Sequence, residues 1–422
     1  MDAGSRYEVA DLALAEAGVR RVEWAERSMP VLRAVRERFA RDLPFAGLRV
    51  AACLQVTAET AGLLRALVSG GAEVRLAASN PLSTQDDTAA ALVCEYGVGV
   101  FARSGVDAET YHRHLAAALD GGPALVFDEG GDLVDALHAG SGALAATVRA
   151  GCEATTSGVL RLRQMHREKA LRFPMVAVDE TPTRRLVDNR YGTGQSTVDG
   201  VMRATSMLLA GRTVVVAGYG PCGTGVAERA RGLGARVVVT EVDPLRALDA
   251  TLQGYQVLPM SAAAKIGEVF ITATGNRDVL RAKHFAVMRD GAVLANAGHF
   301  DVEIDIPALT ELATERRSGV RGHIDEFVLP DGRRLLLVAE GRVVNLTAAE
   351  GNPASVMDIA FAGQALTAAW LVDRDLAPGV HPVPVELDRE VAELRLAAMS
   401  VKIDTLSPEQ RRYLSSWRRD LR

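Results

Sequence analysis

Lysine and cysteine are scarce in this sequence. Only four of its 48 basic residues are lysines, so a catalytic lysine has few places to occur and arginine carries almost all of the positive charge. The four cysteines are scattered and form neither a Cys-x-x-Cys pair nor a Cys/His cluster, which predicts no metal site. We therefore expect reduced cysteines in a cytoplasmic protein.

Membrane and targeting signals are also missing. No apolar run looks long enough to span a bilayer, and residues 1–4 show no signal-peptide pattern. The net charge of −5 gives no reason to expect nucleic acid or a membrane as a partner. At 422 residues the chain is too long for one compact core, so we expect two or three domains.

The strongest local signal lies at residues 213–241. An apolar strand at 213–217 runs into a G-x-G-x-x-G turn, a helix-like segment covers 224–233, and an apolar run at 237–239 leads to Glu241. This order of elements is that of a dinucleotide-binding unit. An acid at the end of the second strand accepts hydrogen bonds from ribose hydroxyls and repels a 2′-phosphate, which favours NAD over NADP. The glycines of the turn are Gly218, Gly220 and Gly223.

The rest of the chain alternates between strand-like and helix-like segments. Polar clusters follow three of the expected strands, at 55–59, 79–86 and 128–132, and further strands are expected at 269–273 and 292–295. Such alternation predicts parallel sheets, with sites at the carboxyl ends of their strands. The predicted fold class is α/β, with two doubly wound parallel-sheet domains and a C-terminal tail.

Ordered motifs occur along nearly the whole length. They are S-T-Q-D at 83–86, E-G-G-D at 129–132, D-N-R-Y-G at 188–192, V-A-G-Y-G at 216–220, G-H-F-D-V-E-I-D at 298–305, A-E-G-R-V-V-N-L at 339–346 and G-V-H at 379–381. In this order they resemble the S-adenosylhomocysteine hydrolase family. The resemblance implies a substrate domain at 1–185 and 352–381, a Rossmann NAD-binding domain at 190–347, and a tail at 382–422 that joins a homotetramer.

The family's reaction is a redox-assisted elimination on an adenine nucleoside. NAD oxidises the ribose 3′-hydroxyl, the C4′ proton becomes acidic, the 5′ substituent leaves, water adds, and the ketone is reduced again. The resemblance implies cofactor contacts at Thr155, Thr156, Ser157, Asn189, Gly218, Gly220, Gly223, Glu241, Asn276, Asn296 and Asn345. It implies substrate contacts at Thr57, Glu59, Asn80, Ala154, Thr155, Asn352 and Met357, with adenine recognised by the first two.

The chain departs from the family pattern where the chemistry takes place. A catalytic Lys of the family is Arg184 here, a His is Gln55 and an Asp is Glu129. Arginine stays protonated and glutamine does not titrate, so neither can easily act as a base. A Glu of the family is Ala154, which opens space near C1′ and C2′ of the sugar. Further departures are Asp179 for Asn, Thr193 for Cys and Asn352 for His.

Five residues are expected to carry the chemistry. Glu129, or else Asp188, would remove the C4′ proton, and Arg184 would position the 3′-hydroxyl together with Asp188 and Thr155. His299 and Gln55 would assist the departing 5′-oxygen. Simpler interpretations stay open: Glu129 as a solvated loop acid, Arg184 as a surface charge, Asp188 as a helix cap and His299 as a structural residue.

Three functions are compatible with this pattern. The preferred one is an NAD-dependent dehydratase that forms a 4′,5′-unsaturated adenine nucleoside, as in the conversion of angustmycin C to angustmycin A. The second is hydrolysis of S-adenosylhomocysteine with tolerated substitutions. The third is a non-catalytic protein that binds NAD and a nucleoside.

Overall fold

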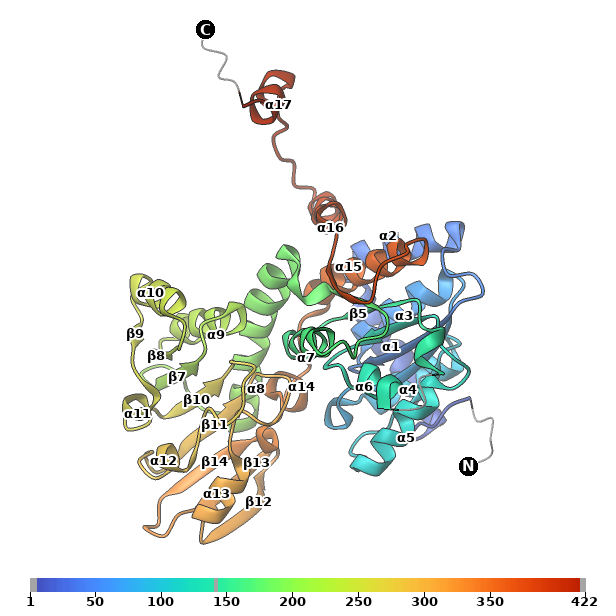
Figure 1. The fold of residues 1–422 in the computed structure, drawn as a ribbon. Helices are drawn as coiled ribbons and strands as arrows, with labels where there is room; N and C mark the ends of the chain where they lie inside the picture. The colour runs from blue at the N-terminus through green and yellow to red at the C-terminus, as the bar shows by residue number, and fades with distance from the viewer. Residues whose placement is uncertain (1–5, 140–142, 418–422) are drawn as a thin grey trace.

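The computed structural model describes residues 6–139 and 143–417, which form two lobes, each built on a β-sheet (Figure 1). Residues 49–177 supply most of the first sheet, sheet A, and residues 213–338 supply the second, sheet B. The chain then returns to sheet A, where residues 379–382 form its last strand. The chain therefore passes between the lobes twice.

Sheet A is parallel throughout. Its strands are β1 (Arg49–Leu54), β2 (Glu73–Ala78), β3 (Gly99–Phe101), β4 (Leu125–Asp128), β5 (Ala150–Glu153), β6 (Pro174–Ala177) and β15 (Gly379–Pro382). Within the described residues their order is β15-β6-β5-β4-β1-β2-β3. Val50 and Ala52 pack into one buried cluster and Ala51 into another, so both faces are covered, as in a doubly wound sheet.

Helices cover the two faces of sheet A. One face carries α1 (Ala15–Glu26), α2 (Pro30–Asp42), α3 (Ala58–Ser69), α4 (Asp86–Cys94), α15 (Ala354–Val372) and α16 (Val385–Ala398). The other carries α5 (Ala108–Leu119), α6 (Asp132–Ala139) and α7 (Thr156–Arg167). Single 3₁₀ turns occur at η1 (Leu12–Leu14), η2 (Pro81–Ser83), η3 (Ala145–Thr147) and η4 (Val178–Glu180).

Sheet B contains the dinucleotide unit. Its strands are β7 (Thr213–Ala217), β8 (Arg236–Thr240), β9 (Gln256–Val257), β10 (Val269–Thr272), β11 (Ala292–Asn296), β12 (Glu315–Arg321), β13 (Ile324–Val328) and β14 (Arg334–Val338), in the order β12-β13-β14-β11-β10-β7-β8-β9. Its helices are α8 (Gly194–Thr205), α9 (Pro221–Gly232), α10 (Pro244–Leu252), α11 (Met260–Ala263), α12 (Ala282–Phe285) and α13 (Ile306–Leu312).

The α/β prediction is confirmed, but sheet B is mixed rather than wholly parallel. Strand β13 pairs antiparallel with both β12 and β14, whereas the other pairs are parallel. Only residues 322–323 join β12 to β13, and a connection that short cannot carry the crossover that parallel strands need.

The chain crosses from sheet A to sheet B through η5 (Arg184–Thr193), a π-helix that continues into α8. This segment packs so closely on α9 that a Cβ on Gly225 would lie 1.9 Å from the Arg190 carbonyl oxygen. The return runs through η6 (Ala339–Gly341), α14 (Val344–Thr347) and α15. The exact limits of the predicted domains remain predictions. Residues 1–5 of the predicted substrate domain and residues 418–422 of the predicted tail lie outside the described part of the chain.

Helix α15 corrects the expectation that no apolar segment could cross a membrane. By length and composition this 19-residue helix could do so, with a mean hydropathy of 1.4 in its most apolar window. However, 61% of that window is buried, and the helix packs on α2, α3 and α16. We infer that α15 is the core helix of this lobe, since it also buries the polar residues Asp358 and Gln364.

Asp358 of α15 connects this helix to α2 and α16. Its carboxylate accepts the N–H groups of Val31 and Leu32 of α2 at 3.2 and 2.7 Å. It also lies 3.2 Å from Nη1 of Arg395 of α16. It thus caps the N-terminus of α2 from another helix. We expect Asp358→Ala to lower the free energy of unfolding by about 2–4 kcal/mol, because buried donors lose a charged acceptor. Urea unfolding followed by circular dichroism measures this, with the exposed Asp373→Ala as control; equal midpoints would contradict the role.

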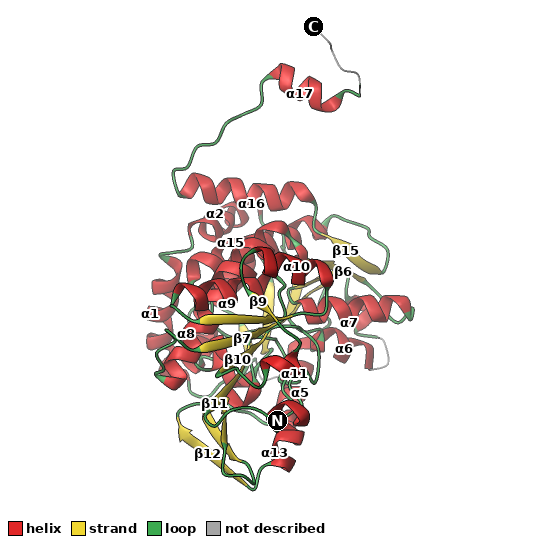
Figure 2. Ribbon diagram, turned by 90° about the vertical axis from the view of Figure 1, so that its left-hand side faces the viewer, coloured by secondary structure: helices red, strands yellow, loops and turns green. Residues whose placement is uncertain are grey.

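The C-terminal segment leaves both lobes. After α16 the chain runs extended and ends in α17 (Pro408–Ser415), which lies away from the two sheets in both views (Figures 1 and 2). Large apolar side chains along it are exposed, among them Ile403 at 67% and Leu414 at 70%.

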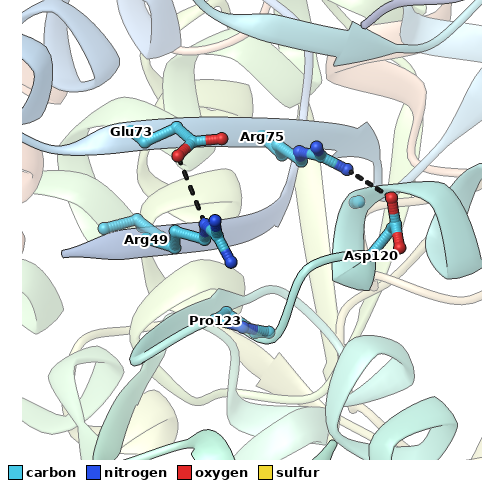
Figure 3. A pocket seen from close by; sticks show the side chains of 7 residues that line it. Arg49, Glu73, Arg75, Asp120 and Pro123 are labelled. Atoms are coloured by element: carbon cyan, nitrogen blue, oxygen red, sulfur yellow. Dashed lines mark hydrogen bonds and ion pairs between the residues drawn. The ribbon is translucent and has the colours of Figure 1, made fainter. Parts of the chain in front are cut away.

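A small pocket lies at the amino ends of the sheet A strands (Figure 3). Arg49 and Glu73, which begin β1 and β2, lie 3.3 Å apart, and Arg75 lies 3.3 Å from Asp120. The volume of about 10 Å³ holds no more than a water molecule. Each arginine already has a carboxylate partner, so we assign no ligand to this pocket.

Candidate active site

A cavity of about 450 Å³ lies between the two lobes and is lined by residues that follow strands of both sheets. Its size is within the range of small-molecule sites. Most of the residues singled out in the sequence line it. They are Gln55, Thr57, Glu59, Glu129, Ala154, Thr155, Thr156, Ser157, Arg184, Asp188, Asn189, Gly220, His299, Asn345, Asn352 and Met357.

Glu129 is held at the end of β4 by its neighbours on β1 and β2. Strands β1 and β4 pair in parallel, so their carboxyl ends bring residues 55 and 129 together. The Oε2 atom accepts the Gln55 backbone N–H at 2.8 Å and the Ser79 hydroxyl at 3.1 Å. Among the described residues no donor reaches Oε1. Only 8% of Glu129 is exposed, which excludes a solvated loop acid.

Burial raises the pKa of the Glu129 carboxyl, against the lowering effects of the Gln55 N–H and the Arg184 charge. A carboxylate with a raised pKa is a stronger base than an exposed one. Glu129 therefore combines a fixed oxygen, a free oxygen and increased basicity.

Arg184 is not a surface charge, since only 9% of it is exposed. Its Nη2 donates to the Ala154 carbonyl at 2.8 Å and lies 3.3 Å from Asp188 Oδ2, while Nε lies 3.6 Å from Asp179 Oδ1. Burial opposes the charged form, but these carboxylates outweigh it and raise the pKa of Arg184. The guanidinium stays protonated. Its Nε and Nη1 are buried without a hydrogen-bond partner in the described chain.

Asp188 lies in the middle of η5 and does not cap α8, whose first residue follows Thr193. Its Oδ1 accepts a hydrogen bond from the Asn352 amide, which also donates to Thr193 Oγ1 at 3.2 Å. Burial raises the pKa of Asp188, with Arg184 acting in the opposite direction. Asn352, at a position where the family resemblance implies a His, thus joins the crossing segment to the returning one.

His299 lies on the loop after β11, on the other wall of the cavity. Burial lowers the pKa of its ring, which favours the neutral form. Among the described residues no hydrogen-bond partner reaches the ring nitrogens. Neutral imidazole both donates and accepts, so His299 is available to a ligand.

Six predicted residues lie outside the lining: Asn80, Gly218, Gly223, Glu241, Asn276 and Asn296. Asn296 is fully buried and donates to the carbonyls of Phe300 and Gly341 at 2.8 and 3.0 Å. It therefore acts on the cavity through the loop that carries His299. Asn80 instead accepts the N–H of Leu82 at 3.1 Å and so shapes η2. Direct ligand contacts by these six residues remain predictions.

The glycine turn after β7 has the shape that a dinucleotide requires. Gly218 has φ of +94°, and a Cβ on Gly223 would lie 1.9 Å from the Gly218 carbonyl oxygen. Helix α9 begins at Pro221 with no side-chain cap, so its first N–H groups are left for a ligand. Glu241 accepts the Tyr219 N–H at 2.6 Å and so holds the turn. These features fit the phosphates of NAD.

Beneath the cavity, Asp128 and Glu153 are paired in register on β4 and β5, and both are fully buried. Glu153 Oε1 accepts the Gly130 and Thr155 N–H groups at 3.0 and 2.8 Å, which fastens the two site loops. The other oxygen, Oε2, and Asp128 Oδ1 have no partner among the described residues. Burial raises the pKa of Asp128 to about 8 and also raises that of Glu153.

The raised pKa of Asp128 predicts that the protein loses stability as the pH rises from about 4 to about 8. The folded state holds the Asp128 proton more tightly than the unfolded chain, so its contribution is present at low pH and is lost as pH rises toward the folded pKa of about 8. We expect a loss of roughly 2 kcal/mol between about pH 6 and about pH 8 and little further change above pH 8, and Asp128→Asn should remove this loss. Urea midpoints across pH measure it, with the exposed Asp120→Asn as control. Parallel pH curves for the protein and Asp128→Asn would contradict it.

Sequence reasoning missed part of the site. Ser79 and Ser83 hold Glu129 and Gln55, and Thr274, Cys222 and Arg246 line the cavity. Ser79 and Ser83 belong to a polar cluster at a strand end, which was the available signal. No pattern in the sequence pointed to Arg246, because it is one of many arginines in the chain.

Comparisons with known proteins agree with this geometry. Residues 189–351 match the family model described as S-adenosyl-L-homocysteine hydrolase, NAD binding domain, and residues 6–151 match the model described as S-adenosyl-L-homocysteine hydrolase. An adenosylhomocysteinase of Aquifex aeolicus is 56% identical over 97% of this chain and 99% of the relative. One of Thermosynechococcus vestitus is 53% identical over 99% and 97%. An S-inosyl-L-homocysteine hydrolase of Methanopyrus kandleri is 50% identical over 97% of both chains.

Proposed function

Because this chain belongs to the S-adenosyl-L-homocysteine hydrolase family, with NAD as cofactor, we propose that it removes the 5′ substituent of an adenine nucleoside. NAD, when bound, supplies a reversible oxidation at C3′ that makes the C4′ proton acidic. The observation that carries the proposal is a buried carboxylate with a free oxygen, Glu129, in the same cavity as the start of the dinucleotide helix.

The side chains of the site would carry out the proton transfers and supply the hydrogen bonds of the reaction. The free Oε1 of Glu129 is available to take the C4′ proton. Arg184 stays protonated, and its Nη1, which has no hydrogen-bond partner among the described residues, is the donor that we assign to the 3′-oxygen. The Gln55 amide can donate a hydrogen bond to the departing group but cannot protonate it. A proton for the departing group must therefore come from Glu129 itself, once it has taken one up, or from His299.

The comparisons favour S-adenosylhomocysteine as the substrate. Relatives named adenosylhomocysteinase are 50–56% identical over nearly the whole chain. In this first candidate function, water adds after elimination, and the products are adenosine and homocysteine. A homocysteine thiolate is a good leaving group, so the absence of a titrating residue at Gln55 costs this reaction little.

A specific observation favours a second candidate, dehydration of a nucleoside such as angustmycin C. Ala154 is buried and lines the cavity where the family resemblance implies a glutamate, so the site has room for a sugar substituent at C1′. In this reaction the 5′-hydroxyl leaves as water and no water adds. The result is a 4′,5′-unsaturated nucleoside, and the changes at Gln55, Glu129 and Arg184 all surround the sugar.

Mass spectrometry separates the candidates. The purified protein is incubated without added NAD with S-adenosylhomocysteine, adenosine and angustmycin C in separate reactions. Release of homocysteine supports hydrolysis, and loss of one water from a nucleoside supports dehydration. Bound NAD with no conversion of any of the three would contradict both and favour the non-catalytic alternative.

We also propose a cytoplasmic homo-oligomer, a tetramer by family resemblance. The support is the extended C-terminal segment, whose large apolar side chains, such as Ile403 and Leu414, are exposed in the described part of the chain. Light scattering of the full chain and of a chain ending at residue 398 tests this: the shortened chain should have a smaller assembly, and equal masses would contradict it.

A further inference from the structure

The side chain of Asn352 has all of its hydrogen-bonding groups occupied by the protein. Its amide nitrogen donates to Asp188 Oδ1 and to Thr193 Oγ1. Its amide oxygen accepts from the Ser196 hydroxyl at 2.6 Å and from Asn345 Nδ2 at 3.5 Å. A primary amide has two N–H groups and two acceptor positions, so this set uses each of them once. The family resemblance implies a substrate contact at this position, but the side chain has no hydrogen-bonding group left for a nucleoside.

The neighbours of Asn352 also determine which way its amide faces. An ionised carboxylate at Asp188 only accepts hydrogen bonds, so the amide nitrogen must face it and the amide oxygen faces Ser196. Ser196 is buried, and its hydroxyl also accepts a hydrogen bond from Asn345 Nδ2 at 3.0 Å. Gly192 packs closely on the same side chain, since a Cβ there would lie 3.1 Å from Asn352 Nδ2. Asn352 is therefore held in one position between η5, α8 and α14.

Two members of this group depart from the family pattern and touch each other. The resemblance implies a His in place of Asn352 and a Cys in place of Thr193, and in this chain Nδ2 and Oγ1 of the two residues lie 3.2 Å apart. A neutral imidazole has one donor and one acceptor, so a His could not make the four contacts of the amide. The four-way link therefore depends on the residue that this chain has at position 352.

The link reaches groups of the cavity on two sides. On one side, Asp188 uses its second oxygen, Oδ2, to hold Arg184 Nη2 at 3.3 Å. The guanidinium is planar and rigid, so this contact also places Arg184 Nη1, the donor that we assign to the 3′-oxygen. On the other side, Asn345 lines the cavity, and its Oδ1 is buried without a partner in the described chain.

We propose that Asn352 is a positioning residue that holds Asp188, and through Asp188 the guanidinium of Arg184, where the 3′-oxygen of the nucleoside binds. This inference rests on the proposed function, because it concerns the same adenine nucleoside. A contact between Asn352 and the base would be a different role, since its contribution would not depend on the sugar.

Two nucleosides that differ only at the 3′ position separate these roles. Adenosine and 3′-deoxyadenosine are titrated calorimetrically into protein saturated with NADH, which cannot oxidise the sugar. Asn352→Ala should raise the Kd of adenosine roughly 10-fold, as expected for a misplaced charged donor, and leave that of 3′-deoxyadenosine nearly unchanged. Gln164→Ala, which removes an exposed amide of α7, should change neither value.

Asn352→Asp adds a pH dependence that a purely structural role would not give. The variant keeps the shape of the amide and places a second carboxyl beside Asp188. A protonated carboxyl can still donate to Asp188, whereas two carboxylates repel each other. The adenosine Kd of Asn352→Asp should therefore rise more steeply with pH than that of the unaltered protein. The other ionisable groups whose electrostatic interactions include Asp188 are the same in both proteins: Arg184, Asp179, Glu129 and Cys222.

Equal losses of affinity for adenosine and 3′-deoxyadenosine in Asn352→Ala would overturn the proposal and assign the side chain to the base. Unchanged Kd values for both nucleosides would overturn it as well. If Asn352→Ala lost its folded circular dichroism spectrum, Asn352→Asp at acidic and neutral pH would provide the same comparison. Binding of neither nucleoside by the unaltered protein would instead contradict the proposed function, and this inference with it.

Discussion

Glu129→Gln is expected to reduce turnover by about 10²–10⁴-fold, whichever substrate the protein converts. The amide has nearly the same shape and keeps an oxygen for the Gln55 and Ser79 donors that now hold Oε2. It cannot accept a proton, so the transfer from C4′ is lost, together with any return of that proton to the departing group. Single-turnover mass spectrometry on the substrate identified above measures the effect, and the NAD content of the purified variant should not change.

A second substitution at this position is the matched control. Glu129→Asp restores the residue type that the family resemblance implies and shortens the side chain by one methylene. It keeps a titrating carboxyl, so it should retain far more activity than Glu129→Gln. If Glu129→Gln kept a tenth or more of the activity, Glu129 would not be the base, and Asp188 would be the next candidate.

Arg184→Met is expected to lower the free energy of unfolding by about 3–5 kcal/mol, the cost of breaking a buried ion pair from one side. The substitution leaves Asp179 and Asp188 buried without their cation. It also leaves the Ala154 carbonyl without its donor. Urea unfolding near neutral pH measures the loss.

The pH dependence distinguishes this cause from simple loss of packing. At acid pH the stranded carboxyls take up protons, so the deficit of Arg184→Met should shrink as the pH falls. Arg184→Lys keeps the charge and should be considerably more stable than Arg184→Met at neutral pH. A deficit that is independent of pH, or equal in both variants, would contradict the electrostatic role.

The sequence predicted those elements of the fold whose conformation depends on residues close to one another in the chain. The strand, glycine turn, helix and acid of residues 213–241 are found as predicted because each depends on neighbouring residues. The polar clusters after β1 and β4 meet because parallel strands bring their carboxyl ends together. The gathering of Gln55 and Glu129 in one cavity could thus be expected from sequence.

Features that depend on distant partners could not be read in this way. In the sequence, Asp358 looks like an interruption of an apolar run. Only the structure shows that it accepts N–H groups at the start of α2. Asn296 looks like a ligand-binding amide, but four carbonyl and amide groups of its own loops occupy it. Arg184 and Arg185 are adjacent and alike in sequence, yet only the first is turned into the core.

The π-helix of residues 184–193 also acts as a spacer of fixed length. Its ten residues, wound with the wider turn of a π-helix, carry the chain from Arg184 to the start of α8. Loss of one residue would let the segment tighten to an α-helix and would rotate everything after it by about 100°. The two walls of the cavity would then be misaligned, even if the residue that was lost did not itself line the cavity. Insertions and deletions should therefore be tolerated far less here than in the loops of either lobe.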